Sequence, residues 1–351
     1  MTQPSLNSTF DASLVDLRET NPADNTGDSF STASSTVPSD GGNQLPNLAQ
    51  AEYRPGAAPA SSTLGVTNAR GMPVHYVPTV TAYDAWSSVY DGDGNILQAV
   101  DDIELATLLP AFLSLAFQDS QETPIRIVDF GCGTGRNTVK LLSQGIGSRQ
   151  LHVRGYDASK GMLDVARQKL ALRLEEARAH GGSTDQLSFD LVQHDFLDPV
   201  DPFAAPVLPP GFDTTTEAVS AVISTLVLEH LPLRPYFAVI RTLLKPNGLA
   251  LVTNMHRDMG LVSQAGFERV DENGVTVKVR GCSWAHGVQE TVEAAREEGL
   301  EVVDVDEGGV KLSVRERTVE NDMIEKGLVS ERGRKWIGKH VWYGVVLRRV
   351  R

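Results

Sequence analysis

The sequence predicts an α/β fold, a doubly wound, mostly parallel, seven-stranded sheet with one antiparallel edge strand and helices on both faces. Three observations lead to this fold class. Apolar residues 125–130 run directly into Gly131, Gly133 and Gly135, as a strand does when it enters a nucleotide-binding turn before a helix. Strand-like and helical segments then alternate five times, which is typical of a parallel sheet. A hairpin-like segment at 267–279 and a late alternating segment at 340–347 add the antiparallel edge.

Composition and charge narrow the class of protein. The chain has 351 residues, 41% of them hydrophobic, and a net charge of −13. This length permits a sizeable core, whereas the acidic balance disfavours nucleic acid phosphates or an anionic membrane as partners. The two cysteines cannot form a disulfide scaffold, and no apolar run reaches the roughly 18 residues of a membrane helix. Since the N-terminus also lacks a secretory pattern, the sequence favours a cytoplasmic protein, with the nucleus as the alternative.

The first 70 residues differ from the rest of the chain. They are rich in Ser, Thr, Pro, Gly and Asn and contain no lysine. Such a segment cannot bury enough apolar surface to offset the entropy cost of ordering it. We therefore expect a disordered tail over residues 1–70 and one folded domain over residues 71–351.

Residues 71–120 are expected to form an N-terminal helical lid. Tyr83, Trp86 and Tyr90 recur at i, i+3 and i+7, which places them on one face of a helix. That face either packs into the core or covers a bound cofactor, and the sequence leaves both open. Residues 96–117 also follow a helical pattern, but Pro110 interrupts it and predicts two helices or a kink.

The remaining elements follow in order after the glycine turn. A helix is expected over 137–143, and a second strand over 151–157 ends in Asp157. An acidic residue about 20 positions beyond the glycines is where a parallel sheet places a carboxylate that accepts from ribose hydroxyls. Ser159 is a suitable N-cap for a helix to about residue 179. Further strands are expected at 187–194, 218–224, 249–253, 300–305 and 340–347, a long loop at 197–216, and a helix at 288–298.

Five short motifs stand in order along the chain: VDFGCGTG at 128–135, GYD at 155–157, HDF at 194–196, LVLEHL at 226–231 and LLKPNG at 243–248. In these motifs and their spacing, the chain resembles class I S-adenosylmethionine-dependent methyltransferases. It is most similar to the ubiquinone/menaquinone-biosynthesis type and to fungal small-molecule relatives. The resemblance covers about residues 80–255. It implies the class I methyltransferase fold, with S-adenosylmethionine as the cofactor.

A nicotinamide-dependent dehydrogenase is the alternative interpretation of the glycine turn. Its fingerprint is Gly-x-Gly-x-x-Gly, whereas the third glycine here comes one place early, at Gly135, and Arg136 follows it. Asp129, at the end of the strand, would repel a pyrophosphate but can attract the ammonium of a methionine group. Both features favour the methyltransferase.

The resemblance also implies how the chain holds the methionine and ribose parts of the cofactor. The backbone of residues 131–135 cradles both parts, Asp129 acts on the ammonium, and Asp157 accepts from the ribose hydroxyls. Thr225 and Leu226 line the methionine end. The sequence departs from many relatives at the start of the fourth strand, where residues 219–220 are Val-Ser in place of Phe-Asp.

The adenine contacts come from two other segments. The resemblance implies that Ala158 and Met162 pack against the adenine, that Asp195 accepts from its amino group, and that Phe196 flanks the ring. The lid tyrosines then close over the site. The predicted cofactor-binding residues are therefore Tyr83, Tyr90, Asp129, Gly131, Cys132, Gly133, Thr134, Gly135, Asp157, Ala158, Met162, Asp195, Phe196, Thr225 and Leu226.

Methyl transfer is an in-line displacement on a sulfonium, so the protein mainly aligns a nucleophile with the methyl group. An alcohol or phenol acceptor also needs a general base. His230 is the best candidate because it lies at the carboxyl end of the fourth strand, although the LEHL run also suits a structural role. His256 and His286 are second candidates, and Cys132 is expected to be a packing residue. No metal-ligand spacing occurs in the sequence, which therefore predicts no metal site.

We expect the acceptor to be a small molecule of secondary or quinone-type metabolism. Its specificity is expected to come from the lid and from an insertion over residues 256–286, where Met259, Phe267 and Trp284 supply apolar surface. Two alternatives stay open, a non-catalytic S-adenosylmethionine-binding regulator and a protein methyltransferase.

Overall fold

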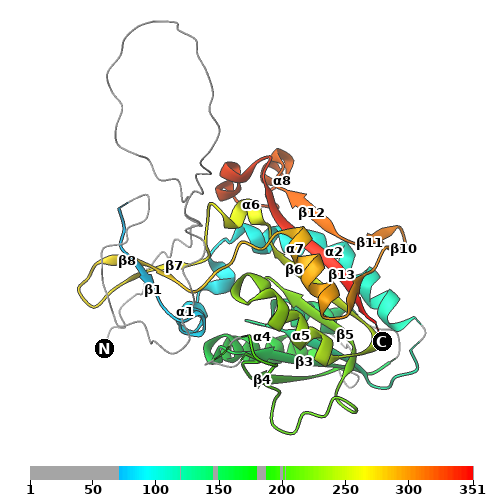
Figure 1. Cartoon of the computed structure of the whole chain (residues 1–351). Coiled ribbons are helices and arrows are strands. Elements are labelled where there is room, and N and C mark those ends of the chain that lie inside the picture. Colours follow the sequence, from blue (N-terminus) through cyan, green and yellow to red (C-terminus); the bar gives the residue numbers. More distant parts are fainter. Residues whose placement is uncertain are drawn as a thin grey trace, which may run out of the picture.

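The computed structural model describes residues 71–118, 120–144, 149–179, 187–197, 201 and 203–350. The expected tail over residues 1–70 lies outside the described residues. Figure 1 shows a central sheet with helices on both of its faces and a smaller sheet beside one end. Among the described residues, no helix has the length and apolar character needed to cross a bilayer.

The central sheet has the strand order β12-β13-β6-β5-β2-β3-β4, and β9 pairs with β13 as well. The five strands from β6 to β4 run parallel to one another. This arrangement confirms the predicted α/β fold class. The parallel strands are β2 (Ile125–Phe130), β3 (Leu151–Asp157), β4 (Leu187–Gln193), β5 (Val219–Thr225) and β6 (Leu244–Met255).

The antiparallel part of the sheet is larger than the sequence predicts. β13 (His340–Arg349) pairs antiparallel with β6, but it is not the edge strand. β12 (Arg315–Thr318) and β9 (Leu300–Val302) both pair with its other side, so the described residues contribute eight strands where seven were expected. The sequence pattern misses β12 because a strand of four residues is too short to show an alternation.

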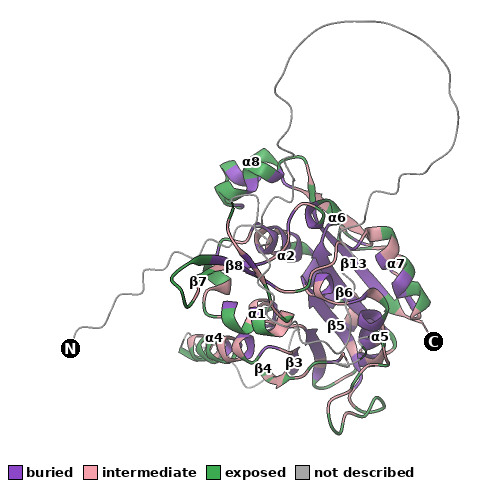
Figure 2. Ribbon diagram, turned by 60° about the vertical axis from the view of Figure 1, so that its left-hand side comes forward, coloured by how far each residue is buried: buried purple, intermediate pink, exposed green. Residues whose placement is uncertain are grey.

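Helices cover both faces of the parallel strands. Ile127 and Val128 are adjacent in β2, point to opposite faces and are both buried, as expected for a sheet covered on both sides. The face of Ile127 packs against α2 (Ile96–Phe117), α3 (Arg136–Ser143) and α4 (Lys160–Ala179). The face of Val128 packs against α5 (Leu233–Leu243) and α7 (Val288–Glu297). Figure 2 shows the buried strands, in purple, between these layers.

α2 is one helix, so the two-helix interpretation of residues 96–117 is wrong. The Asn95 side chain caps it by accepting from the Leu97 N–H at 3.0 Å. Pro110 removes one backbone hydrogen bond from the helix interior. Leu109 and Phe112 on either side of it are 1% and 0% exposed, so tertiary packing outweighs that loss.

A second sheet joins the lid to the insertion. β7 (Phe267–Val270) and β8 (Thr276–Arg280) form the predicted hairpin, which is confirmed. β1 (Val74–Tyr76) pairs parallel with β8, a contact that the sequence did not indicate. Beneath this sheet, Trp86 from α1 (Thr79–Trp86) packs in one small core. That core consists of Ala82, Trp86, Phe267, Val277 and Val279.

The other elements are short. They are the helices α6 (Arg257–Gly260) and α8 (Asn321–Glu325), the 3-10 helices η1 (Tyr90–Gly92), η2 (Leu228–His230) and η3 (Glu331–Trp336), and the hairpin of β10 (Val305–Glu307) and β11 (Val310–Leu312).

Candidate active site

The glycine turn lies at the carboxyl end of β2, and each of its three glycines has a positive φ. The φ angles are 73° at Gly131, 54° at Gly133 and 76° at Gly135. A Cβ on Gly131 would lie 2.3 Å from Val227 Cγ2, whereas a Cβ on Gly133 would have no atom of the described residues within 4 Å. Packing therefore requires glycine at 131. At 133 the backbone borders open space, where a ligand can approach it.

Asp157 is held against the glycine turn by two backbone hydrogen bonds. Its Oδ2 accepts from the Gly133 N–H and its Oδ1 from the Ser159 N–H, both at 2.8 Å. Burial raises the pKa of Asp157 from 3.8 to about 6. A carboxylate has about four acceptor positions, so Asp157 can accept from further donors at the same edge.

Asp129 presents a buried oxygen that no donor satisfies within the described part of the chain. Thr138 Oγ1 donates to Asp129 Oδ2 at 2.6 Å, while Oδ1 has no hydrogen-bond partner there. Asp129 is fully buried, and burial raises its pKa to about 6. A buried acceptor without a donor is costly in a native fold. The arrangement therefore fits a cofactor with a cationic ammonium group, which would supply the missing donor.

Two predicted site residues face the protein interior. A Cβ on Gly155 would lie 2.8 Å from Cys132 Sγ, which places the buried Cys132 thiol against β3. Burial raises its pKa well above the usual value, which makes it a poor nucleophile. The ring of Phe196 is buried and packs edge-on against Phe130 and Tyr156, at 5.4 and 5.1 Å between centroids. Both residues contribute packing beside the turn.

The remaining adenine-side residues lie around the end of β3 and of β4. Met162 is buried in the first turn of α4, and its N–H donates to Ser159 Oγ at 3.1 Å, so Ser159 is the N-cap as predicted. Ala158 lies in the loop before α4 and accepts from the Gln193 side chain at its carbonyl. Asp195 is exposed, and its Oδ1 accepts from the Leu197 N–H.

The end of β5 carries a strained residue beside the turn. Leu226 has a φ of 57°, a left-handed conformation that is unfavourable for a branched side chain. Its N–H donates to the Thr253 carbonyl at 2.9 Å, which holds the backbone there. Thr225, one residue earlier, accepts from Asn137 Nδ2 at 2.7 Å. The segment predicted to line the methionine end is thus tied both to α3 and to β6.

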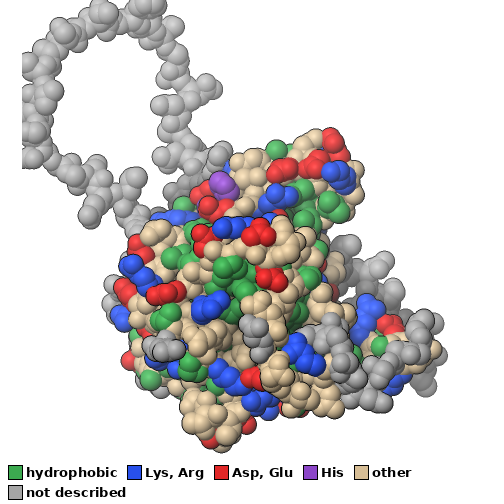
Figure 3. Space-filling model, turned by 90° about the vertical axis from the view of Figure 1, so that its right-hand side faces the viewer, with side chains coloured by type: hydrophobic (Ala, Val, Ile, Leu, Met, Phe, Trp, Pro, Cys, Tyr) green, Lys and Arg blue, Asp and Glu red, His purple; other side chains and the backbone are tan. Residues whose placement is uncertain are grey.

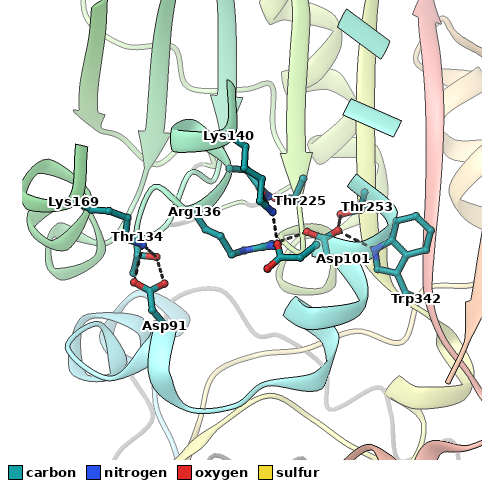
Figure 4. Close-up of polar contacts among 11 residues, drawn as sticks. Asp91, Asp101, Thr134, Arg136, Lys140, Lys169, Thr225, Thr253 and Trp342 are labelled. Atoms are coloured by element: carbon teal, nitrogen blue, oxygen red, sulfur yellow. Dashed lines mark hydrogen bonds and ion pairs between the residues drawn. The ribbon is translucent and has the colours of Figure 1, made fainter. Parts of the chain in front are cut away.

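Polar contacts join the lid to the glycine turn (Figure 4). Thr134 Oγ1 donates to Asp91 Oδ1 at 2.6 Å, and Lys169 Nζ pairs with Asp91 Oδ2 at 2.7 Å. Asp91 belongs to η1, between α1 and α2. Thr134 therefore faces the lid through its side chain.

Asp101 is the centre of the second set of contacts and was missed by the sequence analysis. Its carboxylate pairs with Arg136 at 2.6 Å and accepts from Thr253 Oγ1 at 2.6 Å and from Trp342 Nε1 at 2.9 Å (Figure 4). It is fully buried, whereas the neighbouring Asp102, which also pairs with Arg136, is half-exposed. An aspartate in a helix pattern predicts a solvent-facing position, so no signal in the sequence distinguishes the two.

The lid aromatics form a cluster, although not on one helix. α1 ends at Trp86, so Tyr90 lies in η1, which corrects the single-face expectation. Tyr83 lies 5.7 Å from Trp86 and 5.8 Å from Tyr90, measured between ring centroids. Trp86 stacks on Phe267 of the insertion at 5.6 Å. The turn at residues 87–89, between α1 and η1, brings the three rings together in place of helical periodicity.

Within the described part of the chain, His230 contacts a lid tyrosine, whereas the other two candidate histidines do not. The Cys282 carbonyl can only accept, so His230 Nδ1 donates to it at 2.8 Å. His230 Nε2 then accepts from the Tyr83 hydroxyl at 2.6 Å. His286 Nε2 donates to the Leu231 carbonyl, and His256 Nε2 pairs with Glu316, so both are held by other elements.

The fold is Rossmann-like, and the site fits a cofactor that carries a cationic amino group and a ribose. Three features together favour such a ligand: the turn after β2, the carboxylate at the end of β3, and the Asp129 oxygen that has no partner among the described residues.

Known proteins agree with this class. The family described as "Methyltransferase domain" matches residues 128–250. A protein described as an uncharacterized methyltransferase of Emericella nidulans is 41% identical over 286 residues, which are 79% of this chain and 93% of the relative. The chain therefore belongs to the methyltransferase family, and S-adenosylmethionine is its methyl donor.

Solved structures resemble the chain more distantly. The CcbJ methyltransferase from Streptomyces caelestis is 16% identical with a TM-score of 0.42, over 78% of this chain and 99% of that one. The [4+2]-cyclase SpnF is 17% identical with a TM-score of 0.42, over 80% of this chain and 99% of that one.

Proposed function

We propose that the protein methylates a small-molecule acceptor. The observation that carries this proposal is the contact between Tyr83 of the lid and His230 of η2, the 3-10 helix after β5. The lid and the insertion pack on each other through Trp86 and Phe267, so the cover beside the glycine turn is one unit. A polypeptide acceptor would have to displace that unit. The net charge of −13, and the mixture of acidic and basic side chains on the face in Figure 3, also favour a small molecule over nucleic acid.

We infer the cofactor contacts from the site geometry and, for the adenine, from the family resemblance. The backbone at Gly133 approaches the ligand, Asp129 Oδ1 accepts from the ammonium, and Asp157 accepts from the ribose hydroxyls. The adenine lies beside Ala158 and Met162. S-adenosylmethionine supplies an electrophilic methyl group on a sulfonium. The chain in turn supplies alignment, because Leu226 and Thr225 hold the end of β5 rigidly beside the turn.

We assign the general base to a pair formed by Tyr83 and His230. Burial raises the pKa of Tyr83 well above 10.0, so the phenol stays neutral and cannot act as a base alone. Its oxygen can accept the acceptor's proton while its own proton passes to His230 Nε2, 2.6 Å away. Glu229 Oε1 lies 3.9 Å from Nε2, where its carboxylate stabilises the resulting imidazolium. The Cys282 carbonyl holds the ring in the required tautomer.

Titration calorimetry tests the cofactor assignment. The full chain should bind S-adenosylmethionine, and Asp157→Ala should abolish the binding. Asp190→Ala is the matched control. It removes the same charge as Asp157→Ala, but from an exposed aspartate on the neighbouring strand β4. Equal binding by the wild type and Asp157→Ala would contradict the placement of the ribose.

Incubation with cell extract and methyl-labelled cofactor tests the acceptor class. Label in a small-molecule fraction supports the proposal. Label in a polypeptide would show a protein methyltransferase, and cofactor binding without any labelled product would show a non-catalytic regulator.

A double-mutant cycle tests the Tyr83–His230 pair with the acceptor recovered from that extract. Tyr83→Phe and His230→Gln should each lower kcat by about 10²- to 10⁴-fold, the usual contribution of a general base. The double variant should be no slower than the slower single variant, because both residues act in one transfer. His286→Gln is the control and should keep most activity, since His286 contacts Leu231. Multiplied losses in the double variant would show that the two residues act independently.

A further inference from the structure

Three side chains from two distant segments of the chain converge near the carboxyl end of β6. His256 follows β6, Asp258 lies in α6, and His340 begins β13. Figure 1 shows α6 beside β13. Asp258 Oδ2 lies 3.6 Å from His256 Nδ1 and 3.6 Å from His340 Nδ1. All three ligand atoms lie within 4.8 Å of one another.

These separations are close to those of ligands around one metal ion. Zn²⁺ binds imidazole nitrogen and carboxylate oxygen at about 2.0–2.2 Å, so tetrahedral ligands lie roughly 3.4 Å apart. The two distances to Asp258 already approach this value. The two imidazole nitrogens need to move closer, and His340 has room to turn because 46% of its side chain is exposed.

The hydrogen bonds of His256 prepare its Nδ1 as a ligand. The Asp258 N–H donates to Nδ1 at 3.1 Å, so Nδ1 carries a lone pair and Nε2 carries the proton. Nε2 donates to Glu316 Oε1 at 2.9 Å. A carboxylate that accepts from the other ring nitrogen is the usual support of a metal-bound histidine, because it fixes the tautomer and raises basicity. With a metal on Nδ1, the backbone N–H of the exposed Asp258 would need water as its acceptor.

The charges also suit a dication. Asp258 and Glu316 bring two carboxylates to the cluster, and the ion pairs that they form within the described residues are with His256 and His340. A dication bound between the two histidines would offset this negative charge. Two nitrogen ligands select a transition metal over Mg²⁺ or Ca²⁺, which prefer oxygen.

We propose that His256, Asp258 and His340 form a binding site for one divalent transition-metal ion of the Zn²⁺ class. Glu316 orients His256, and water completes the coordination on the exposed side of His340. The ion connects the end of β6 to the start of β13 and, through Glu316, to β12. This site is separate from the Tyr83–His230 pair and does not depend on the acceptor.

Calorimetry with Zn²⁺ tests the site, using the full chain without an affinity tag after treatment with chelator. We expect one Zn²⁺ per chain, and no measurable binding by His340→Ala or Asp258→Ala. Glu316→Ala should bind about 10- to 100-fold more weakly, as is usual when the supporting carboxylate is lost. His152→Ala is the matched control, because His152 lies 3.3 Å from Asp190 in an ordinary surface pair, and it should bind like the wild type.

Folding of each variant is checked by circular dichroism and by S-adenosylmethionine binding. His340 and Asp258 are exposed, so both variants should fold. Absence of Zn²⁺ binding by the wild type would overturn the proposal. Zn²⁺ binding that is retained by both His340→Ala and Asp258→Ala would also overturn it, because the ion would then lie elsewhere.

Discussion

Replacement of Asp101 by asparagine should destabilise the protein far more than the same change at Asp102. Both aspartates lie in α2 and pair with Arg136, but the Asp101 side chain is 0% exposed and that of Asp102 is 45% exposed. In Asp101→Asn the amide oxygen can still accept from Thr253 and Trp342. Its NH₂ group, however, faces the Arg136 guanidinium, which is also a donor.

The size of the effect follows from burial. Breaking a buried ion pair costs about 3–5 kcal/mol, and because Arg136 keeps Asp102 we expect the lower end, about 3 kcal/mol. Asp102→Asn removes half-exposed pairs with Arg136 and Lys140, and pairs of that kind contribute about 0–1 kcal/mol.

Urea unfolding followed by circular dichroism measures both values, and the thermal midpoint of Asp101→Asn should fall by roughly 6–12 °C. Equal losses from the two variants would refute the argument that burial decides the strength of these pairs.

Three further predictions concern the turn, the buried carboxylate and the lid. Gly131→Ala should lower the free energy of unfolding by about 2–4 kcal/mol, because its Cβ meets Val227 at 2.3 Å and its φ is left-handed. Gly133→Ala should cost only about 1–2 kcal/mol yet lose S-adenosylmethionine binding, and an unchanged affinity would place the cofactor elsewhere. Burial raises the pKa of Asp129 from 3.8 to about 6, so its contribution to stability is full below pH 3.8 and is lost as the pH rises through about 6. Without cofactor, Asp129→Asn should therefore be more stable than the wild type at pH 8 by roughly 2–3 kcal/mol. If the difference in unfolding free energy between the variant and the wild type is the same at pH 4 and at pH 8, this explanation is wrong. Trp86→Ala removes a buried ring that stacks on Phe267, at a cost of about 3–5 kcal/mol. Amide hydrogen exchange should therefore accelerate in β7 and β8 while β2 stays protected. Unchanged exchange in the hairpin of β7 and β8 would show that the lid and the insertion are not one unit.

The glycine turn and its carboxylates could be predicted from the sequence because they are local features. A buried strand, three glycines and a helix follow one another within a few residues, and parallel strands bring their carboxyl ends to one edge. Gly133 follows β2 and Asp157 ends β3, the next strand, so their order along the chain already places them together, as the hydrogen bond between them shows. The family resemblance depended on the same short segments.

Contacts between distant segments left no such signal. The partners of Asp101 come from α3, β6 and β13, and a helix pattern cannot tell this buried aspartate from Asp102 beside it. The pairing of β1 with β8 and the contact of Tyr83 with His230 likewise join residues far apart in the chain. Residues 256, 258 and 340 have no ligand spacing in the sequence, yet the antiparallel pairing of β13 with β6 brings them together. The sequence by itself determined the fold class and the cofactor turn, since periodicity and short motifs record local structure. Only the tertiary structure decided what covers that turn, because the meeting of two distant segments depends on how the whole chain packs.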